Sequence, residues 1–216
     1  MVCKFIREDI VNAVLSQYRD RSDAAHRDDH IKKVILNAQK MCDIFGVEYN
    51  LEIELACLFH DIGLAYYKDD SENHHITSAD VFLIYYQKMG IELSIDQVHT
   101  IVGCILKHRA STKCERNAME RIVWAADRGF PNTTKEDVYN NMVMRSVSYY
   151  ISKYGMKRDD AHRKAYDHLL GKYDTYVGYA YDSYPEEYMK MFADELEVQS
   201  FILNDLASEK YICSNN

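Results

Sequence analysis

Proline and glycine are scarce in this chain, with 2 Pro and 8 Gly among 216 residues. The few that occur separate long segments in which apolar residues recur every three or four positions, which is the spacing of an amphipathic helix. This composition excludes a collagen-like repeat, and 47% hydrophobic residues argue against a disordered chain. We therefore expect an all-α protein that is large enough to bury a hydrophobic core.

Long apolar runs are also missing. No stretch reaches the roughly 18 to 20 consecutive apolar residues that span a bilayer. The first ten residues, MVCKFIREDI, contain no hydrophobic core of a signal peptide. We expect a cytoplasmic protein without a membrane partner.

The chain has no excess of positive charge. It carries 26 Lys and Arg against 34 Asp and Glu, a formal net charge of −8. This balance argues against a nucleic-acid polymer or an anionic membrane as the main partner. A small anionic substrate could still bind at a local cationic site, such as a metal ion.

Paired cysteine motifs are absent as well. The six cysteines are scattered and form no CxxC pair: Cys3, Cys42, Cys57, Cys104, Cys114 and Cys213. Neither a disulfide scaffold nor a thiolate zinc site is therefore indicated. Cys42, Cys57 and Cys104 lie within apolar patterns, and we expect them to be small buried residues.

The apolar spacing predicts nine helices. They cover about residues 6–20, 28–45, 51–63, 76–89, 95–108, 117–126, 135–153, 159–171 and 185–207. Gly46, Gly63 and Gly90 fall where helices are expected to stop, and Ser94 or Asp96 is expected to cap the helix that leads to His108. We expect a single domain with a core over 1–130 and a helical extension over 131–216 packed on that core.

Tyrosines are concentrated between Lys172 and Pro185. Five occur in this stretch: Tyr173, Tyr176, Tyr179, Tyr181 and Tyr184. Tyrosines can line a ligand groove, but packing between helices with the hydroxyl groups reaching water is the commoner arrangement. We expect packing here.

Ionisable residues stand at the ends of several apolar segments. His26 and His30 are four residues apart before an apolar helix, and His60 and Asp61 follow the apolar run that ends at Phe59. An unpaired charge at a buried helix end costs several kcal/mol or shifts its pKa until the group is neutral. A metal ion would remove that cost.

Further candidates close other apolar segments: His74 or His75, His108 and Asp127. A single histidine at a helix end is usually a cap or a core residue. The whole set in this order favours a shared metal site over independent structural roles. His99, His162 and His168 fit no ligand pattern and are expected to be surface or capping residues.

The order His30, His60-Asp61, Asp127 resembles the HD-domain superfamily of metal-dependent phosphohydrolases, whose pattern is H…HD…D. Flanking residues extend the resemblance over about residues 20–130. Ala25–Val34 is similar to the family's first histidine motif, and Leu55–Gly63 is similar to its AAxLHDIG motif. A tail element at His168–Lys172, which lacks the usual Glu, resembles an uncharacterised bacterial branch.

The resemblance implies an α-helical HD-domain bundle that acts as a phosphoric ester hydrolase with one or two divalent ions. It assigns one ion to His30, His60, Asp61 and Asp127. It assigns a second ion to His74 and His108, with Asp61 bridging the two. His75 replaces His74 if the register shifts by one residue.

A set of imidazoles and carboxylates without thiolate suits Fe, Mn, Zn, Co or Ni, and Mg also stays open. Such an ion lowers the pKa of a bound water to about 7, which supplies hydroxide without a protein nucleophile. We expect Asp61 and Lys33 to be catalytic. Lys33, Lys107 and Arg109 are candidates for steadying the anionic substrate, and a solvated charge on a helix surface is the alternative for each of them. Lys33 stands where the family commonly has Arg, and it lacks the planar fork that binds phosphate with two donors.

The expected substrate is a small phosphorylated molecule, with a nucleotide as one candidate. Two alternatives remain: an HD-fold diiron oxygenase, and a non-catalytic module that senses a nucleotide. Asp28 or His26 could orient a ligand or move a proton. The sequence leaves the oligomeric state open, a homodimer included.

Overall fold

The computed structural model describes residues 2–19, 27–66, 72–109, 114–174, 178 and 184–213, the last four by their backbone only. All regular secondary structure in these ranges is helical, and none of it is strand. The all-α prediction is therefore confirmed. Over the same ranges, no helix is both long and apolar enough to cross a membrane.

The chain forms two compact units. Among the described residues, the first unit runs to Gly129 and the second begins at Phe130. Each unit has its own set of packed helices, so we describe each by itself. The expected docking of a C-terminal extension onto the core stays a prediction.

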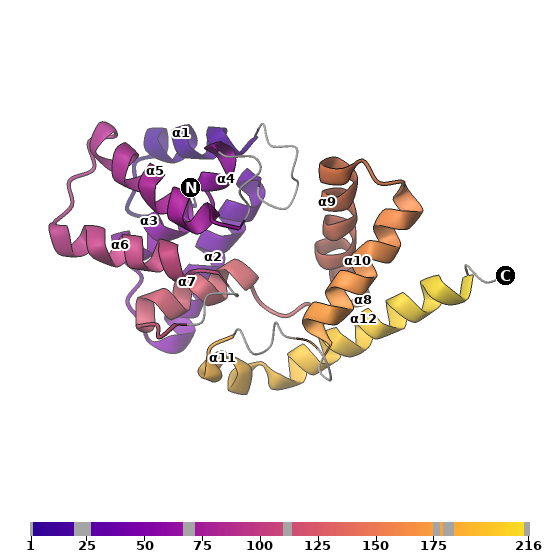
Figure 1. The fold of residues 1–216 in the computed structure, drawn as a ribbon. Coiled ribbons are helices and arrows are strands. Elements are labelled where there is room, and N and C mark those ends of the chain that lie inside the picture. Colours follow the sequence, from indigo (N-terminus) through magenta and orange to yellow (C-terminus); the bar gives the residue numbers. More distant parts are fainter. Residues whose placement is uncertain are drawn as a thin grey trace. The chain divides into compact units, whose positions relative to one another are not determined.

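The first unit is built around one buried helix. Its helices are α1 (Glu8–Arg19), α2 (Asp28–Phe45), α3 (Leu51–Phe59), α4 (Gly63–Tyr66), α5 (His74–Lys88), α6 (Ile95–Lys107) and α7 (Ala118–Arg128). Helix α3 contacts α2, α6 and α7, and α5 packs against α4 and α6 (Figure 1). Every residue of α3 from Ile53 to Phe59 is buried. A helix that is almost wholly apolar needs this central position. Its one buried charged residue, Glu54, accepts hydrogen bonds from three backbone nitrogens near the start of the chain.

Local signals define several helix ends in the first unit. Ser94 caps α6 in a capping box with Gln97, as the sequence predicts, and Gly46 ends α2 in the left-handed conformation at φ 65°. The prediction for Gly63 is wrong: α3 ends earlier, at Phe59, and Gly63 begins α4. Its role lies in a close approach between helices, described below.

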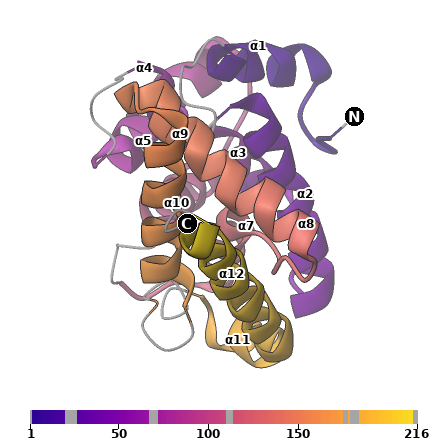
Figure 2. The same cartoon turned by 90° about the vertical axis from the view of Figure 1, so that its right-hand side faces the viewer.

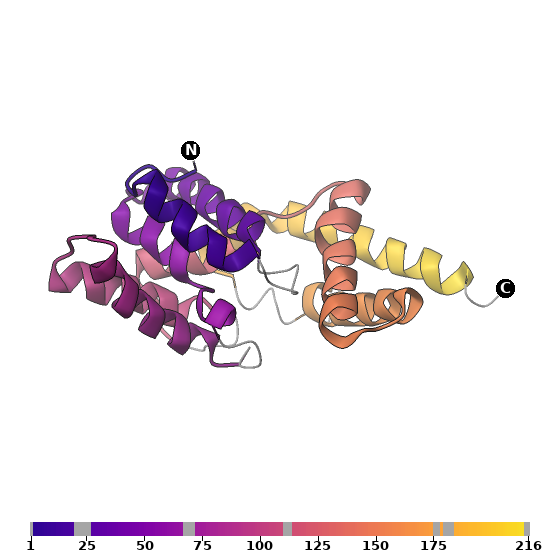
Figure 3. The same cartoon turned by 90° about the horizontal axis from the view of Figure 1, so that it is seen from above.

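The second unit contains a long helix with an unusual middle. Helix α8 (Lys135–Asp137), the π-helical segment Val138–Met144 and α9 (Arg145–Tyr154) follow one another without a break. Helix α10 (Arg158–Tyr173) returns beside α9 (Figure 2). Phe192 separates α11 (Glu186–Met191) from α12 (Ala193–Cys213), which continues as one helix to the end of the described chain (Figure 3).

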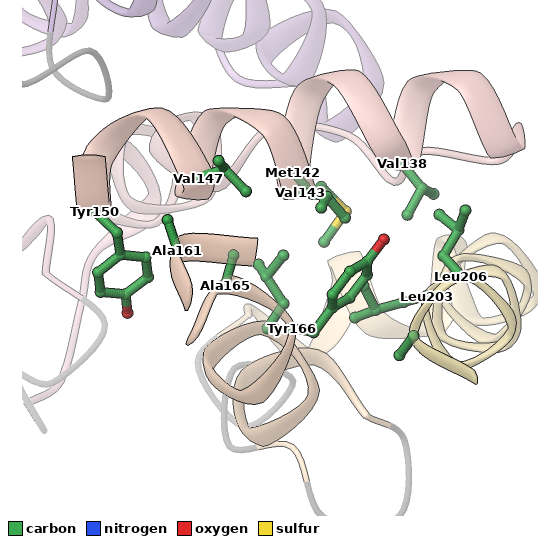
Figure 4. Packing of buried hydrophobic residues seen from close by; sticks show 12 residues of the cluster. Val138, Met142, Val143, Val147, Tyr150, Ala161, Ala165, Tyr166, Leu203 and Leu206 are labelled. Atoms are coloured by element: carbon green, nitrogen blue, oxygen red, sulfur yellow. The ribbon is translucent and has the colours of Figure 1, made fainter. Parts of the chain in front are cut away.

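Three helical segments form the apolar core of the second unit. Figure 4 shows Val138, Met142, Val143, Val147 and Tyr150 on the first segment, Ala161, Ala165 and Tyr166 on α10, and Leu203 and Leu206 on α12. His162 belongs to the same buried face of α10, with 4% of its surface exposed. The prediction of a surface or capping role is therefore wrong for His162, because the helical register places it between Ala161 and Ala165. His99 and His168 are exposed, as predicted.

The tyrosine-rich stretch is only partly described. Tyr173 packs against the core of the second unit, and the ring of Tyr184 stacks on Tyr188 with centroids 4.5 Å apart. These two tyrosines confirm the packing interpretation. Tyr176, Tyr179 and Tyr181 lie outside the described residues.

Candidate metal centre

Six ionisable side chains of the first unit gather at the ends of its helices. They are His30, His60, Asp61, His74, His108 and Asp127. His30 lies in the first turn of α2, His60 and His108 directly follow α3 and α6, and His74 is the first residue of α5. These are the six residues that the sequence resemblance assigns to metal binding.

Four of the side chains form a first donor group. Nε2 of His30 lies 3.2 Å from Oδ1 of Asp127 and 3.6 Å from Oδ2 of Asp61. Nε2 of His60 lies 3.2 Å from the same Asp61 oxygen and 3.5 Å from Oδ1 of Asp127. Two imidazole nitrogens and two carboxylate oxygens therefore surround one point.

A second donor group shares Asp61. Its other oxygen, Oδ1, lies 3.1 Å from Nε2 of His74 and 3.4 Å from Nε2 of His108. The two imidazole nitrogens are themselves 3.1 Å apart. Each oxygen of Asp61 thus belongs to a different donor group. Among the described residues, His74 and not His75 enters this group.

Hydrogen bonds determine how two of the imidazoles face the centre. Nδ1 of His60 lies 2.8 Å from the carbonyl oxygen of Cys57, and Nδ1 of His108 lies 2.6 Å from that of Ile105. A carbonyl oxygen only accepts, so we assign the ring proton to Nδ1 in both residues. In the neutral ring, Nε2 then presents a lone pair to the centre, as metal-binding histidines do.

The Nε2 atom of His60 provides the test of whether a metal fits. It is fully buried and makes no hydrogen bond, although carboxylate oxygens lie 3.2 and 3.5 Å away. In the neutral ring, lone pairs on nitrogen and oxygen would repel one another at this distance. A cation between them turns that repulsion into attraction.

The donor distances agree with such a cation. An ion about 2.1 Å from each nitrogen or oxygen keeps neighbouring donors about 3.0–3.4 Å apart in octahedral or tetrahedral geometry. The nitrogen–oxygen separations within the first group are 3.2 to 3.6 Å, and the separations within the second are 3.1 to 3.4 Å. The residues present therefore fit a divalent metal in both groups.

The carboxylates of the centre are held in their charged form. Burial alone would raise the pKa of Asp61, but His60, His108 and His30 hold it well below its usual range. Burial likewise opposes ionisation of Asp127, whose pKa His30 and His60 keep well below the usual value. Burial disfavours a charged His60, yet Asp61 and Asp127 raise the pKa of that imidazole well above its ordinary value. Without a metal, a proton on His60 takes the place of the missing positive charge.

Close packing brings Asp61 to the helix that carries His74. A Cβ atom on Gly63 would lie 2.5 Å from the carbonyl oxygen of His74 and 2.7 Å from the nitrogen of Ser78. The Gly63 nitrogen donates to Oγ of Ser78 at 2.9 Å. Only glycine allows this approach between the turn after Asp61 and α5.

Two further hydrogen bonds hold ligand-bearing helices to their neighbours. Asn37 on α2 is buried and donates to the carbonyl oxygen of Ala126, next to Asp127 on α7, at 3.1 Å. The hydroxyl of Tyr18 donates to the carbonyl oxygen of Leu58 near the end of α3, at 3.0 Å. These bonds fix the positions of the helix ends relative to one another.

The predicted substrate contacts have varied surroundings. Lys33 is exposed on α2, three residues after His30. Nζ of Lys107 forms an ion pair with Glu120 at 2.9 Å, and Arg109 donates to the carbonyl oxygen of Glu72. The contact of these three cations with a substrate stays a prediction.

The predicted role of Asp28 and His26 in orienting a ligand or moving a proton also stays a prediction. Asp28 pairs with Lys32 at 2.8 Å and with Arg19 at 3.5 Å. His26 lies outside the described residues.

Sequence reasoning missed a group of residues beside the centre. Arg128 follows Asp127 and has a side chain only 7% exposed, with Nη1 3.9 Å from the Asp127 carboxylate and 3.3 Å from the carbonyl oxygen of His108. The guanidinium groups of Arg128 and Arg116 both lie over the ring of Trp124, at 5.3 and 4.0 Å from its centroid. Trp124 is the only tryptophan of the chain, and its rarity was the one sequence signal that pointed to this group of residues.

Comparisons with protein families, with curated proteins and with solved structures found no match to this chain. The metal centre therefore rests on the geometry of the chain itself. The described residues form a buried cluster of histidines and aspartates that could hold a metal ion in each of two adjoining groups.

Proposed function

We propose that the chain is a metal-dependent phosphohydrolase related to the HD-domain superfamily, and that it hydrolyses a small phosphate ester. The observation that carries the proposal is Asp61, whose two oxygens each belong to a separate group of donors. A carboxylate shared in this way is the arrangement that places two ions side by side. The sequence order His30, His60-Asp61, Asp127 also supports the relationship.

The six side chains divide the work of holding the ions. His30, His60 and Asp127 would hold the first ion, His74 and His108 the second, and Asp61 both. When bound, the ions would supply a water of lowered pKa and positive charge opposite the phosphate oxygens. This chemistry needs no serine or cysteine nucleophile.

The carboxylates of the centre are suited to ligation more than to proton transfer. A general base works best when its pKa lies near the working pH. The pKa values of Asp61 and Asp127 are held well below the usual carboxylate range by the surrounding histidines. The catalytic role of Asp61 in this proposal is therefore to bridge the ions and orient them.

The substrate reaches the centre from the side of Asp127. The side chain of Asp127 is 24% exposed, whereas those of His60 and Asp61 are 0% and 4% exposed. Lys33, one turn beyond His30, and Arg109, next to His108, would steady the negative charge of the phosphate. Lys107 is a weaker candidate because Glu120 already neutralises its ammonium group.

Metal analysis combined with a substrate screen tests the proposal. We expect the purified chain to contain up to two divalent ions and to release phosphate from phosphomonoesters or nucleotides with Mn, Mg, Fe or Co. Asp61→Asn should abolish both metal binding and turnover while the helical circular dichroism is retained. Asp96→Asn, at an exposed position in the first turn of α6, is the matched control and should behave like the wild type.

Other outcomes would redirect the assignment. Oxygen uptake that requires iron, without phosphate release, would contradict hydrolysis and support the diiron oxygenase. Nucleotide binding without turnover in the metal-loaded protein would support a sensing module. Full metal content and activity in Asp61→Asn would contradict the assignment of the centre.

A further inference from the structure

The end of α6 requires support that its own helix does not supply. His108 directly follows the last residue of α6, Lys107. The last carbonyl groups of a helix have no partner within it, so the chain around His108 presents free acceptors. The direction of its imidazole depends on how these backbone groups are held.

Two arginines bind three successive carbonyl groups at this helix end. Nε of Arg116 donates to the carbonyl oxygen of Lys107 at 2.9 Å, and Nη2 of Arg116 donates to that of Arg109 at 3.1 Å. Nη1 of Arg128 lies 3.3 Å from the carbonyl oxygen of His108 between them. Positive charge at a helix C-terminus is favourable in addition to these bonds.

Trp124 provides the surface on which both arginines lie. The guanidinium carbon of Arg116 is 4.0 Å from the indole centroid, close enough for a cation–π contact. The indole belongs to α7, which also carries Asp127. The stacked arginine therefore connects the end of α6 to a helix that is already part of the centre.

The side chain beside His108 is held by the same helix. Nζ of Lys107 forms an ion pair with the carboxylate of Glu120 on α7, whose side chain is only 7% exposed. The same carboxylate accepts from the nitrogen of Asn117 at 2.8 Å and so caps α7. Both the backbone and the side chain of Lys107 are thus tied to one neighbouring segment.

We infer that Arg116 is a positioning residue for His108: its guanidinium group, stacked on Trp124, holds the carbonyl groups on both sides of His108 and directs the imidazole toward Asp61 and His74. This inference rests on the proposed function, because it takes the second donor group to be an ion site. The described contacts of Arg116 are with backbone carbonyl groups and with the ring of Trp124. The effect of Arg116 is on the second ion and not on the first.

Arg116→Lys is the informative substitution. Lysine keeps the positive charge, but one ammonium group cannot reproduce the planar fork that reaches two carbonyl groups and stacks on the indole. Substitution of a residue that hydrogen-bonds to a metal ligand typically lowers metal affinity by about 10-fold to 100-fold. We expect Arg116→Lys to lower the affinity for the second ion about 10-fold and to change the affinity for the first ion by no more than about twofold.

The experiment measures metal binding and not activity. Metal-free protein is titrated with Mn²⁺ or Co²⁺ by equilibrium dialysis, and the bound metal per chain is fitted to two sites. Arg116→Met, which removes every hydrogen-bond donor of the side chain, should lower the affinity for the second ion more than Arg116→Lys does. Arg7→Lys is the matched control, since Arg7 is exposed and pairs only with Asp9 in the described contacts.

A second readout follows His108 without any metal. In the metal-free protein, nitrogen-detected NMR of the imidazole should show the Nδ1 proton in the wild type and its faster exchange in Arg116→Lys. Circular dichroism of each variant is recorded to show that the helices remain folded. A change in the imidazole signals with intact helices supports a positioning role over a general loss of structure.

The outcomes separate this inference from the proposed function. Two ions in the wild type and unchanged second-ion affinity in both Arg116 variants would overturn the inference alone. Equal weakening of both ions would also overturn it, because the effect would then not be specific to His108. A wild-type chain that binds fewer than two ions would contradict the two-ion centre and this inference with it.

Discussion

At the scale of single residues, substitution of Lys33 tests whether this lysine binds the proposed substrate. It is exposed on α2, three residues after the ligand His30. A hydrogen bond to a charged group contributes about 1.5–3 kcal/mol, and the lower figure corresponds to about 10-fold in binding. Lys33→Ala should therefore raise KM about 10-fold and change kcat less than twofold.

Steady-state kinetics with a phosphomonoester substrate measures this effect. Lys40→Ala, an exposed lysine further along the same helix, is the control and should leave KM unchanged. An equal loss of kcat and kcat/KM in Lys33→Ala would mean that the lysine acts only in the transition state. No change at all would exclude it from the substrate site.

The cysteines offer a test of the core that is independent of metal. Burial raises the pKa of Cys3, Cys42 and Cys104 to about 12, and it raises that of Cys57 well above the usual thiol value. Since the thiolate is the reactive form, these residues should be inert in the folded protein. Cys114 is exposed and should react.

A thiol reagent such as DTNB reports this difference by absorbance. In a Cys213→Ser background, one thiol should react in buffer and the other four only after denaturant is added. Rapid reaction of several thiols in buffer would contradict the described packing. The sequence already predicted burial of Cys42, Cys57 and Cys104, and the structure confirms it.

At the scale of helices, Gly63 marks a close approach of α4 to α5. A Cβ atom there would meet backbone atoms of α5 at 2.5 and 2.7 Å, which cannot move independently of the helix. Overpacking of this kind costs about 1–3 kcal/mol. Gly63→Ala should lower the free energy of unfolding by that amount. It should also lower the affinity for the second ion, because α5 carries His74.

Urea denaturation and metal titration measure the two effects. Gly171→Ala is the matched control: this glycine lies within α10 and has no atom within 4 Å of an added Cβ. Alanine is the better helix former there, so the control should be neutral or more stable by up to about 1 kcal/mol. A Gly63→Ala protein as stable as the wild type would show that α4 and α5 do not approach so closely.

The helices were predictable from the sequence because their signals are local. Apolar spacing and caps such as Ser94 depend on neighbours within a few residues, and they placed most helices within a few positions. The break after Phe59, by contrast, depends on contact with α5, which is distant in sequence. The contacts of Arg116 and Arg128 with the carbonyl groups at the end of α6 also join positions that are 7 to 20 residues apart. An arginine near a helix end has no pattern that reveals its partner.

At the scale of the whole molecule, the described donor groups all belong to the first unit. A ligand that binds only the folded state adds about 2.7 kcal/mol of stability at 100 times its dissociation constant. A chelator should therefore lower the melting temperature of the first unit and leave the second unchanged. Calorimetry combined with hydrogen exchange assigns each transition to its helices. An equal shift in α9, α10 and α12 would contradict independent stabilisation of the first unit.

The size of the chelator effect should depend on pH. In the metal-free protein, Asp61 and Asp127 raise the pKa of His60 well above its ordinary value, despite its burial. The unfolded chain loses this proton near pH 6.5 while the folded chain keeps it, so the stabilisation is complete below about pH 6.5 and is lost as the pH rises toward the folded pKa. The metal-loaded protein does not depend on this proton. The difference in melting temperature between loaded and metal-free protein should therefore grow from pH 6 to pH 9. A difference that stays constant or shrinks would show that His60 does not carry the compensating charge when the metal is absent.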